Sequence, residues 1–282
     1  MAWEKFRKKK VPDGLWMKCN GCQQMVFKKL VEEKLNVCPD CNCHYPISAR
    51  QRIALTLDEN SYYEYDPSMA PVDALNFSDL KSYRDRLKAA QELTGLKDAV
   101  LTGEGTIDSK PVVFSALDSR FIMGTMGSVV GEKITRAFER ATEKMVPLIA
   151  FSASGGARMH ESCLSLAQMS KTSAAVARYS EAGGFFISVL VHPCYGGVSA
   201  SYAFLGDIIL AEPKADIGFA GPRTILHTLK MELPKGFQSS EFHLENGFID
   251  MVVERSQMKK VLSRLIDYFK PRRQRGEARA VL

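Results

Sequence analysis

Two glycine pairs constrain the fold of this chain most, because each stands where a run of strand-forming residues ends and a stretch of small residues begins. The pairs are Gly155-Gly156 and Gly196-Gly197. A strand-to-helix step leaves backbone N–H groups without partners at a helix N-terminus, where the helix dipole is positive. A glycine there lets a ligand oxygen approach without a Cβ in the way. These two pairs, the glycine corners, therefore predict one anion-binding active site built from backbone.

Length and hydropathy favour a globular chain. Its 282 residues are 45% hydrophobic, which suits one large domain with a small appendage. No stretch reaches the roughly 18 unbroken apolar residues of a membrane helix. Residues 1–10 are basic but lack the apolar run of a secretory signal. We therefore expect a cytoplasmic protein with no membrane partner.

The net charge of +6 is unevenly distributed. Residues 1–50 carry ten Lys and Arg against five Asp and Glu, and residues 270–282 carry five against one. The middle of the chain holds the remaining 23 basic and 26 acidic residues and is slightly acidic. The basic ends suit an anionic partner, such as nucleic acid, an acidic protein or a phosphorylated substrate, or they serve only as solubilising tails.

Four of the seven cysteines have the double-knuckle spacing of a tetrahedral zinc site. Cys19 and Cys22 are separated by two residues, as are Cys38 and Cys41, with fifteen residues between the pairs. Zn²⁺ prefers four thiolates at tetrahedral corners, and a two-residue gap lets one tight turn present two sulfurs to the same ion. The spacing predicts one zinc per chain and favours a reducing compartment.

The predicted zinc ribbon occupies residues 1–50, with a short strand over residues 25–31 between the knuckles. A closed four-cysteine site leaves no open coordination position, so its zinc is expected to be structural. Cys43 and His44 follow directly and are alternative ligands in place of Cys41. Lysines in the ribbon leave nucleic-acid binding open as an alternative role, although no RNA-binding aromatic signature accompanies them.

Beyond the ribbon, residues 51–282 alternate between strand and helix patterns. Strands are expected at 112–117, 148–152 and 186–191, and helices at 79–94, 128–145, 160–181, 198–205 and 256–269. Two short strands within residues 206–223 lead to a third glycine turn, with a proline placed to begin a helix. This alternation favours an α/β domain with right-handed crossovers.

Three kinds of chemistry compete for the glycine corners. A phosphate-binding loop needs a lysine that is missing at the required spacing. A serine hydrolase would use Ser154 as nucleophile with His160 or His192 as base, but the chain lacks the Gly-x-Ser-x-Gly elbow. An oxyanion hole for a thioester enolate needs only two backbone N–H groups and a base. The nearest carboxylate in the sequence is Glu161, and a glutamate at the start of a helix usually interacts with the helix dipole. The catalytic base is then expected from elsewhere in the protein or from the second substrate.

Six features follow one another along the chain. They are the four-cysteine ribbon, SGGARM (154–159), GGVSASYA (196–203), LGDIILAEP (205–213), IGFAGPR (217–223) and LPKGFQ (233–238). In this order they closely resemble the β subunits of the bacterial-type acetyl-coenzyme A carboxylase carboxyltransferase. The resemblance covers nearly the whole chain, and several motifs in fixed order are far more specific than a glycine pair alone.

The resemblance implies a crotonase-like ββα superhelix after the ribbon. It implies a biotin-dependent enzyme that transfers the carboxyl group from carboxybiotin, on a biotin carboxyl carrier protein, to acetyl-coenzyme A. The product is malonyl-coenzyme A, and the reaction that forms it is the first committed step of fatty acid biosynthesis. By this carry-over Gly155 and Gly156 hold the acetyl enolate oxygen, Gly196 and Gly197 line the same cleft, and biotin itself takes the acetyl proton.

The resemblance also implies an incomplete enzyme. In this family an α subunit of similar fold supplies the biotin-side half of the site in an α2β2 heterotetramer, which works with biotin carboxylase, so this chain is expected to be active only with an α subunit. Arg158 and Arg223 are candidate contacts for coenzyme A phosphates or a carboxylate, with a purely structural role as the alternative.

Three departures from the family pattern flank the expected site. They are His160, where glutamine is usual, Ser162-Cys163, where glycine is usual, and residues 192–195 before the second glycine corner. They leave the acyl preference open, with acetyl expected and propionyl or another short acyl group as the alternative. A function of another class also stays open, namely a zinc-ribbon nucleic-acid-binding regulatory protein on a crotonase scaffold.

Overall fold

The computed structural model describes residues 15–230, 234 and 236–268, without the side chains of Arg223 and Leu229. The chain forms two compact units that divide between Tyr45 and Pro46. This boundary precedes the predicted one at residue 50, because Ser48 already caps the first helix of the larger unit. Residues 46–50 therefore belong to the larger unit rather than to the ribbon.

The smaller unit is a ribbon followed by a short helix. Its elements are β1 (Trp16–Lys18), β2 (Met25–Phe27) and α1 (Lys28–Glu33), and the two strands pair antiparallel. The strand predicted over residues 25–31 is thus strand only in its first half. Lys28 and Lys29 each pair with a glutamate four residues on, at 3.8 and 4.0 Å, a spacing that supports a helix.

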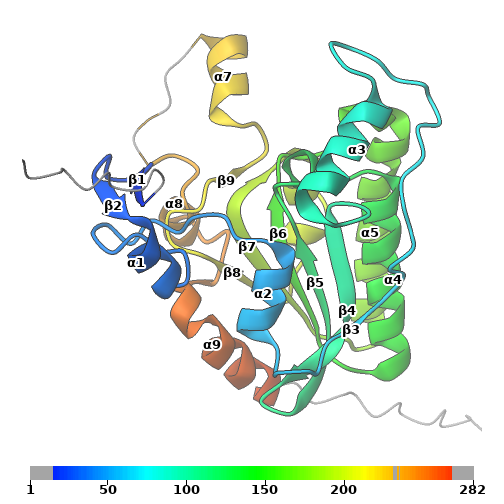
Figure 1. The fold of residues 1–282 in the computed structure, drawn as a ribbon. Coiled ribbons are helices and arrows are strands. Elements are labelled where there is room, and N and C mark those ends of the chain that lie inside the picture. Colours follow the sequence, from blue (N-terminus) through cyan, green and yellow to red (C-terminus); the bar gives the residue numbers. More distant parts are fainter. Residues whose placement is uncertain (1–14, 231–233, 235, 269–282) are drawn as a thin grey trace, which may run out of the picture. The chain divides into compact units, whose positions relative to one another are not determined.

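The larger unit is built on one sheet of eight described strands (Figure 1). They are β3 (Tyr63–Glu64), β4 (Val100–Ile107), β5 (Lys110–Leu117), β6 (Leu148–Ser154), β7 (Phe186–Tyr195), β8 (Ile208–Ala211), β9 (Ile217–Gly218) and β10 (Met251–Val252). The order is β10-β8-β7-β6-β5-β4-β3, with β9 paired to β7. β3, β4 and β5 are antiparallel neighbours, whereas β5 to β8 and β10 run parallel. The predicted α/β architecture is confirmed.

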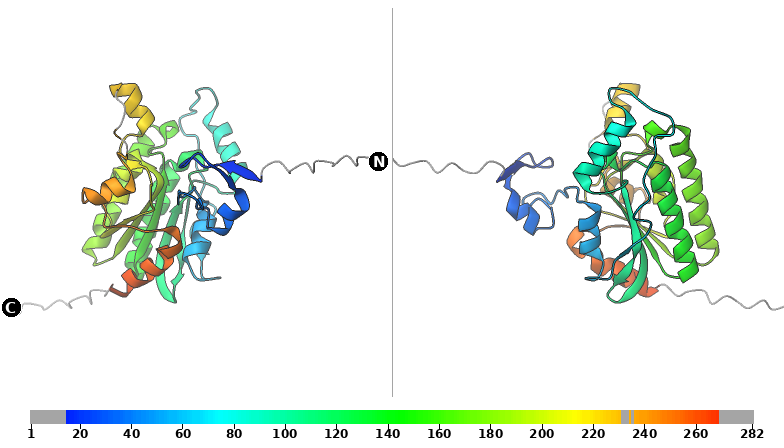
Figure 2. Two further views of the ribbon diagram at one scale, coloured as in Figure 1. Left: turned by 90° about the vertical axis from the view of Figure 1, so that its left-hand side faces the viewer. Right: turned by 45° about the vertical axis from the view of Figure 1, so that its right-hand side comes forward.

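Helices cover both faces of this sheet. The helices of the larger unit are α2 (Ala49–Thr56), α3 (Tyr83–Thr94), α4 (Ser128–Lys144), α5 (Cys163–Glu181), α6 (Gly196–Ser199), α7 (Pro222–Leu229), α8 (Ser240–Glu245) and α9 (Arg255–Tyr268), of which α7 projects away from the sheet (Figure 1). Figure 2 shows α4 and α5 on one side and α2 and α9 on the other. Among the described residues, no helix has the length and apolar character needed to span a membrane.

Two aromatic contacts fix the helices to opposite faces. Phe138 of α4 meets the ring of Phe186 edge-on, with centroids 4.9 Å apart. Arg52 of α2 lies over the ring of Phe151, 4.8 Å from its centroid. Phe186 is in register with Leu148, three residues before Phe151, so the two rings point to opposite sides of the sheet.

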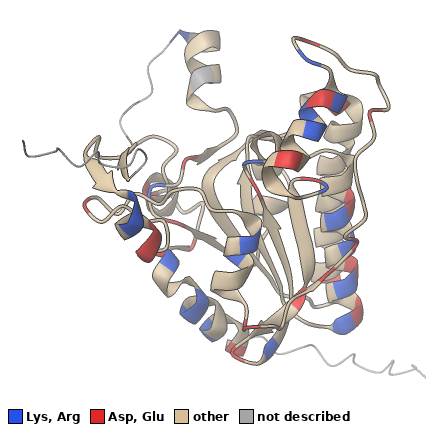
Figure 3. Ribbon diagram, in the orientation of Figure 1, with Lys and Arg blue, Asp and Glu red and all other residues tan. Residues whose placement is uncertain are grey.

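The central parallel strands carry the core. β6 is buried along its whole length, and β7 over its first six residues. Neither contains Lys, Arg, Asp or Glu, and Figure 3 shows those residues mainly on the surrounding helices and loops. Strands covered on both faces are expected to be continuously apolar in this way. The carboxyl ends of β6 and β7, which carry the glycine corners, therefore extend from a closely packed base.

Candidate active site and metal centre

The two glycine corners lie against each other at the carboxyl ends of β6 and β7. Ser154 and Cys194 are the last paired residues of these neighbouring strands. A Cβ built on Gly156 would lie 3.2 Å from Gly196 Cα and 3.3 Å from Gly197 N. Gly156 and Gly196 also have positive φ angles, 116° and 59°, which glycine adopts without strain. The structure thus brings the two predicted glycine corners together, backbone against backbone.

The N–H groups of the first glycine corner are already used inside the protein. Gly155 N–H donates to Met123 O at 2.8 Å, and Gly156 N–H donates to Ser154 Oγ at 3.0 Å. The helix predicted from residue 160 begins only at Cys163, after a loop with a 3₁₀ turn. The expectation of bare N–H groups on Gly155 and Gly156 at a helix N-terminus is therefore wrong.

Two other N–H groups beside this corner have no protein acceptor among the described residues. In the described part of the chain, neither Ala157 N–H nor Gly197 N–H donates to a protein acceptor. A Cβ built on Gly197 would lie 3.2 Å from Ala157 N, so the two groups are neighbours. Gly196 N–H, by contrast, donates to Phe219 O at 2.9 Å. Gly197 is therefore one of the predicted site glycines, whereas Ala157 replaces Gly155 and Gly156 as the donor of the first corner.

Arg158 is a structural residue, not a substrate contact. Its side chain has no exposed surface, and its guanidinium donates to both carboxylate oxygens of Asp98, at 3.0 and 2.6 Å. Burial alone would lower the pKa of Arg158, but the Asp98 carboxylate outweighs burial and raises this pKa. A coenzyme A phosphate cannot reach a fully buried guanidinium, so the substrate-contact prediction for Arg158 is corrected.

Arg223 is the second residue of α7. Its side chain lies outside the described residues, and its role stays a prediction. Pro222 begins α7, as the sequence pattern predicts.

The groups required for a serine hydrolase are not assembled. Ser154 Oγ is buried and bonded to the backbone of Gly156. His160 stacks on Tyr83, with ring centroids 5.1 Å apart, and burial lowers the pKa of His160. His192 pairs with Asp216 at 3.3 Å. Within the described residues neither histidine bonds to Ser154, so the geometry does not support a nucleophile with a base.

Glu161 interacts with the N-terminus of a helix, as its position predicts, but that helix is α4 and not the one predicted over residues 160–181. Its Oε2 accepts the N–H of Ser128, the first residue of α4, at 2.6 Å. Its Oε1 accepts the hydroxyl of Tyr83 at 2.6 Å. Both carboxylate oxygens are therefore engaged. Sequence reasoning missed Tyr83 and Asp98, because no local pattern signals a partner that lies 60 residues away in the chain, as Asp98 does from Arg158.

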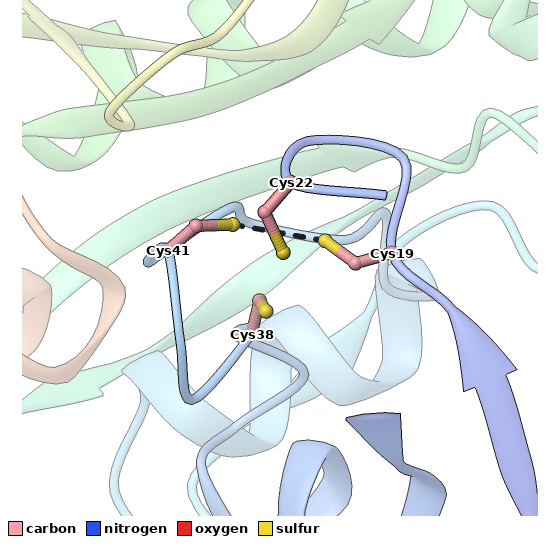
Figure 4. A group of neighbouring side chains, drawn as sticks. All are labelled: Cys19, Cys22, Cys38 and Cys41. Carbon is pink, nitrogen blue, oxygen red and sulfur yellow. Dashed lines mark hydrogen bonds between the residues drawn. The ribbon is translucent and has the colours of Figure 1, made fainter. Parts of the chain in front are cut away.

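The four predicted cysteine ligands converge on one point. The sulfur atoms of Cys19, Cys22, Cys38 and Cys41 all lie within 4.8 Å of one another, and those of Cys19 and Cys41 are 3.7 Å apart (Figure 4). Four sulfurs at the usual distance from a tetrahedral zinc would be about 3.8 Å apart. The donor set and its spacing therefore fit a structural zinc.

The alternative ligands stand beside this group. A Cβ built on Gly21 would lie 3.2 Å from the sulfur of Cys41 and 3.3 Å from that of Cys43. The ring of His44 contacts the backbone of Asn42, with its Nδ1 3.1 Å from Asn42 O. Neither Cys43 nor His44 belongs to the converging set, so Cys41 keeps the fourth position.

Two family models match the chain. A model of the carboxyl transferase domain matches residues 47–276, and a model of the acetyl-CoA carboxylase zinc finger domain matches residues 16–41. The two matches correspond to the larger and the smaller unit.

Curated relatives agree with these models. A protein of Rhodopirellula baltica named acetyl-coenzyme A carboxylase carboxyl transferase subunit beta is 55% identical over 263 residues, which cover 93% of this chain and 84% of the relative. A protein of Citrifermentans bemidjiense with the same name is 54% identical over 257 residues, 91% of each chain.

Solved structures share the fold of the larger unit. Transcarboxylase 12S, solved with methylmalonyl-coenzyme A and methylmalonic acid bound, is 25% identical, with a TM-score of 0.67 over 78% of this chain and 41% of that chain. A malonate decarboxylase heterodimer from Pseudomonas is 24% identical, with a TM-score of 0.59 over 80% of this chain and 90% of that chain, and shows the shared fold alone. The chain therefore belongs to the family of acetyl-coenzyme A carboxylase carboxyl transferase β subunits, with a crotonase-like α/β domain behind a four-cysteine zinc ribbon.

Proposed function

We propose that this chain is the acetyl-coenzyme A half of a biotin-dependent carboxyltransferase. It transfers the carboxyl group of carboxybiotin, carried on the biotin carboxyl carrier protein, to acetyl-coenzyme A, and the product is malonyl-coenzyme A for fatty acid biosynthesis. Family membership supports this reaction. The observation on the chain that supports it most is the contact between the glycine corners, where a Cβ built on Gly197 would lie 3.2 Å from Ala157 N.

The chemistry needs a place for negative charge. When the acetyl group loses an α-proton, charge develops on the thioester oxygen, and two fixed N–H donors stabilise that oxygen without having to reorganise. Ala157 N–H and Gly197 N–H are the donors we assign. Gly156 and Gly196 then shape the corner, because a side chain on either one would press against the backbone of the other. Gly155 lies on the opposite side of this loop, where a Cβ would be 3.3 Å from Met123 Cβ.

The base arrives with the second substrate in this proposal. Glu161 is the carboxylate that the sequence places nearest the glycine corners. Its Oε2 accepts a hydrogen bond from Ser128 N–H, and its Oε1 accepts one from Tyr83 OH. It is therefore poorly placed to take a proton from substrate. Biotin, after releasing its carboxyl group, is the proposed proton acceptor.

An α subunit completes the enzyme. The family name, subunit beta, supports such a partner. We infer the α2β2 assembly, the link to biotin carboxylase and a reducing cytoplasmic location that suits a zinc thiolate centre. The contacts of Lys28 and Lys29 with Glu32 and Glu33 weaken the case for nucleic-acid binding, because they offset the basic charge of α1.

The test is reconstitution with an α-type subunit. Malonyl-coenzyme A decarboxylation with free biotin is measured for each subunit alone and for the pair, and activity is expected only from the pair. An inactive pair that instead binds RNA tightly and in a salt-sensitive way would refute the proposal. Running the reaction towards carboxylation with acetyl- and propionyl-coenzyme A decides the acyl preference, for which acetyl is expected.

A further inference from the structure

The backbone that carries the first glycine corner is bonded to a facing segment of the chain, residues 122–126. Gly155 N–H donates to Met123 O at 2.8 Å, Met126 N–H donates to Gly156 O at 2.8 Å, and Arg158 N–H donates to Met126 O at 2.9 Å. The position of Ala157, between Gly156 and Arg158, therefore depends on where this facing segment lies.

The facing segment is strained. Ile122 and Met123 have φ angles of 42° and 57°, in the left-handed region that side chains with a Cβ rarely adopt. Such conformations persist only where the surroundings hold them, and they concentrate at functional sites. Some group must therefore hold residues 122–126 in place.

The side chain of Arg158 meets this need. Its Nη2 donates to Thr125 O at 2.7 Å, and its Nε donates to Thr125 Oγ1 at 3.2 Å. Arg158 thus contacts the facing segment twice, through its backbone and through its guanidinium. Because Arg158 follows Ala157 directly, its backbone and its guanidinium together hold the facing segment beside the Ala157 peptide.

Asp98 fixes the guanidinium in turn. Its two carboxylate oxygens accept from Arg158 at 3.0 and 2.6 Å, and both side chains are fully buried. Its Oδ1 also accepts the N–H of Ala99 at 2.6 Å, which ties the carboxylate to the backbone just before β4. A bidentate pair of this kind defines the plane and direction of the guanidinium.

A second carboxylate completes the cluster. Glu161 Oε1 lies 3.6 Å from Arg158 Nη1, and Tyr83 OH lies 3.2 Å from the same nitrogen. A Cβ built on Gly127 would lie 2.4 Å from Glu161 Oε1, so the glycine makes room for this carboxylate. The cluster therefore joins α3, β4, the start of α4 and the loop that holds the glycine corner.

We propose that Asp98 is a positioning residue for carboxyl transfer, acting through Arg158 to fix the direction of the Ala157 N–H. This inference rests on the proposed function, because it assigns that N–H to the substrate oxygen. Small misplacements of a catalytic group reduce turnover strongly even when substrate binding is unchanged. Loss of Asp98 is therefore expected to act on kcat and to spare KM.

The main test is the Asp98→Asn variant in the reconstituted pair. It preserves the size of the side chain but removes the charge and one acceptor oxygen. We expect kcat for malonyl-coenzyme A decarboxylation to fall about 10- to 100-fold, with KM for malonyl-coenzyme A within about twofold and an unchanged zinc content. A wild-type kcat in Asp98→Asn would overturn the proposal.

A matched control separates positioning from stability. Leu262 belongs to α9, which lies on the other side of the sheet from α4, and its side chain is completely buried. Leu262→Ala should lower the unfolding temperature while leaving kcat near the wild-type value. If Leu262→Ala lowers kcat as much as Asp98→Asn does at the same loss of stability, Asp98 is only structural.

A milder second variant is Thr125→Val, which removes one acceptor of the Arg158 guanidinium. It should lower kcat severalfold, and an unchanged kcat would contradict the proposed contact.

A measurement independent of activity keeps this inference separate from the proposed function. Hydrogen exchange of a peptide covering residues 155–162 should be faster in Asp98→Asn than in wild type and unchanged in Leu262→Ala. An inactive wild-type pair would refute the proposed function, while exchange still reports on the positioning. Unchanged exchange in Asp98→Asn would refute the positioning role even in an active enzyme.

Discussion

Gly156 and Gly196 pack so closely that a Cβ built on either would lie 3.2 or 3.0 Å from the Cα of the other. Such contacts with backbone atoms cannot be relieved by turning a side chain. Gly156 follows β6 and Gly196 directly follows β7, so their contact sets the width of the proposed oxyanion site.

A side chain at Gly156 should stop turnover. In Gly156→Val the new atoms would press on Gly196 and Gly197, and a φ of 116° is unfavourable for valine. We expect kcat of the reconstituted pair to fall at least about 1,000-fold, with assembly and zinc content retained. Decarboxylation assays and size-exclusion chromatography check both points.

Gly247→Ala is the matched control for Gly156→Val. Gly247 also has a positive φ, 72°, but a Cβ there would meet nothing within 4 Å. The Gly247→Ala variant should lose some stability through backbone strain, and its kcat should stay at the wild-type value. An unchanged rate in Gly156→Val would contradict the assignment of the glycine corner to the oxyanion site.

Replacing one zinc ligand should empty the metal centre. Cys38 is fully buried in the four-cysteine set. Cys38→Ser should lose the zinc and unfold the smaller unit, because a structural site needs all its ligands. Metal content by mass spectrometry measures this, with Cys163→Ser, an exposed cysteine outside the set, as the control that keeps one zinc per chain. Retention of zinc in Cys38→Ser would point to Cys43 or His44 as a substitute.

A buried ionic group predicts acid sensitivity. Glu212 accepts from Arg52 at 2.5 Å and from Arg255 at 2.8 and 2.6 Å. Burial alone would raise the pKa of Glu212, but the two guanidinium groups lower it to about 2, from an ordinary value of 4.5. Because the folded pKa lies below the unfolded one, the stabilisation is complete above pH 4.5 and declines as pH falls towards 2.

Urea unfolding of wild type and Glu212→Gln tests this pH dependence. The variant should be less stable at pH 7, because it leaves two buried arginines without their charge partner. The difference in free energy of unfolding should shrink as the pH is lowered from 5 towards 3. Parallel pH profiles for the two proteins would show that Glu212 does not carry the effect.

Removing the N-terminal cap of α2 should cause a modest loss of stability. Ser48 Oγ accepts the N–H of Gln51 at 3.1 Å, and Gln51 Oε1 accepts the N–H of Ser48 at 3.0 Å. Ser48→Ala removes one half of this reciprocal cap and should cost about 1 kcal/mol of unfolding free energy. Ser180→Ala, on the exposed end of α5, should change it by less than about 0.5 kcal/mol. Equal stabilities for the two variants would argue against the cap.

The features determined by the sequence itself are those that depend on spacing along the chain. The two-residue gaps between cysteines define the zinc ligands, because one tight turn presents two sulfurs. Continuous apolar runs define β6 and β7, and the helical spacing of Val130, Ile134 and Phe138 defines α4. Parallel neighbouring strands then bring both glycine corners to one edge of the sheet.

Only the tertiary structure decided which backbone groups are free. Gly155 looks like a bare donor in the sequence, but the facing segment supplies Met123 O to its N–H, whereas Ala157 N–H has no protein acceptor among the described residues. Arg158 looks like an anion contact in the sequence, but in the fold it is fully buried and paired with Asp98. Both outcomes depend on hydrogen-bond partners that lie far away in the chain, and no local pattern encodes which distant carbonyl or carboxylate will reach a given group once the core has packed.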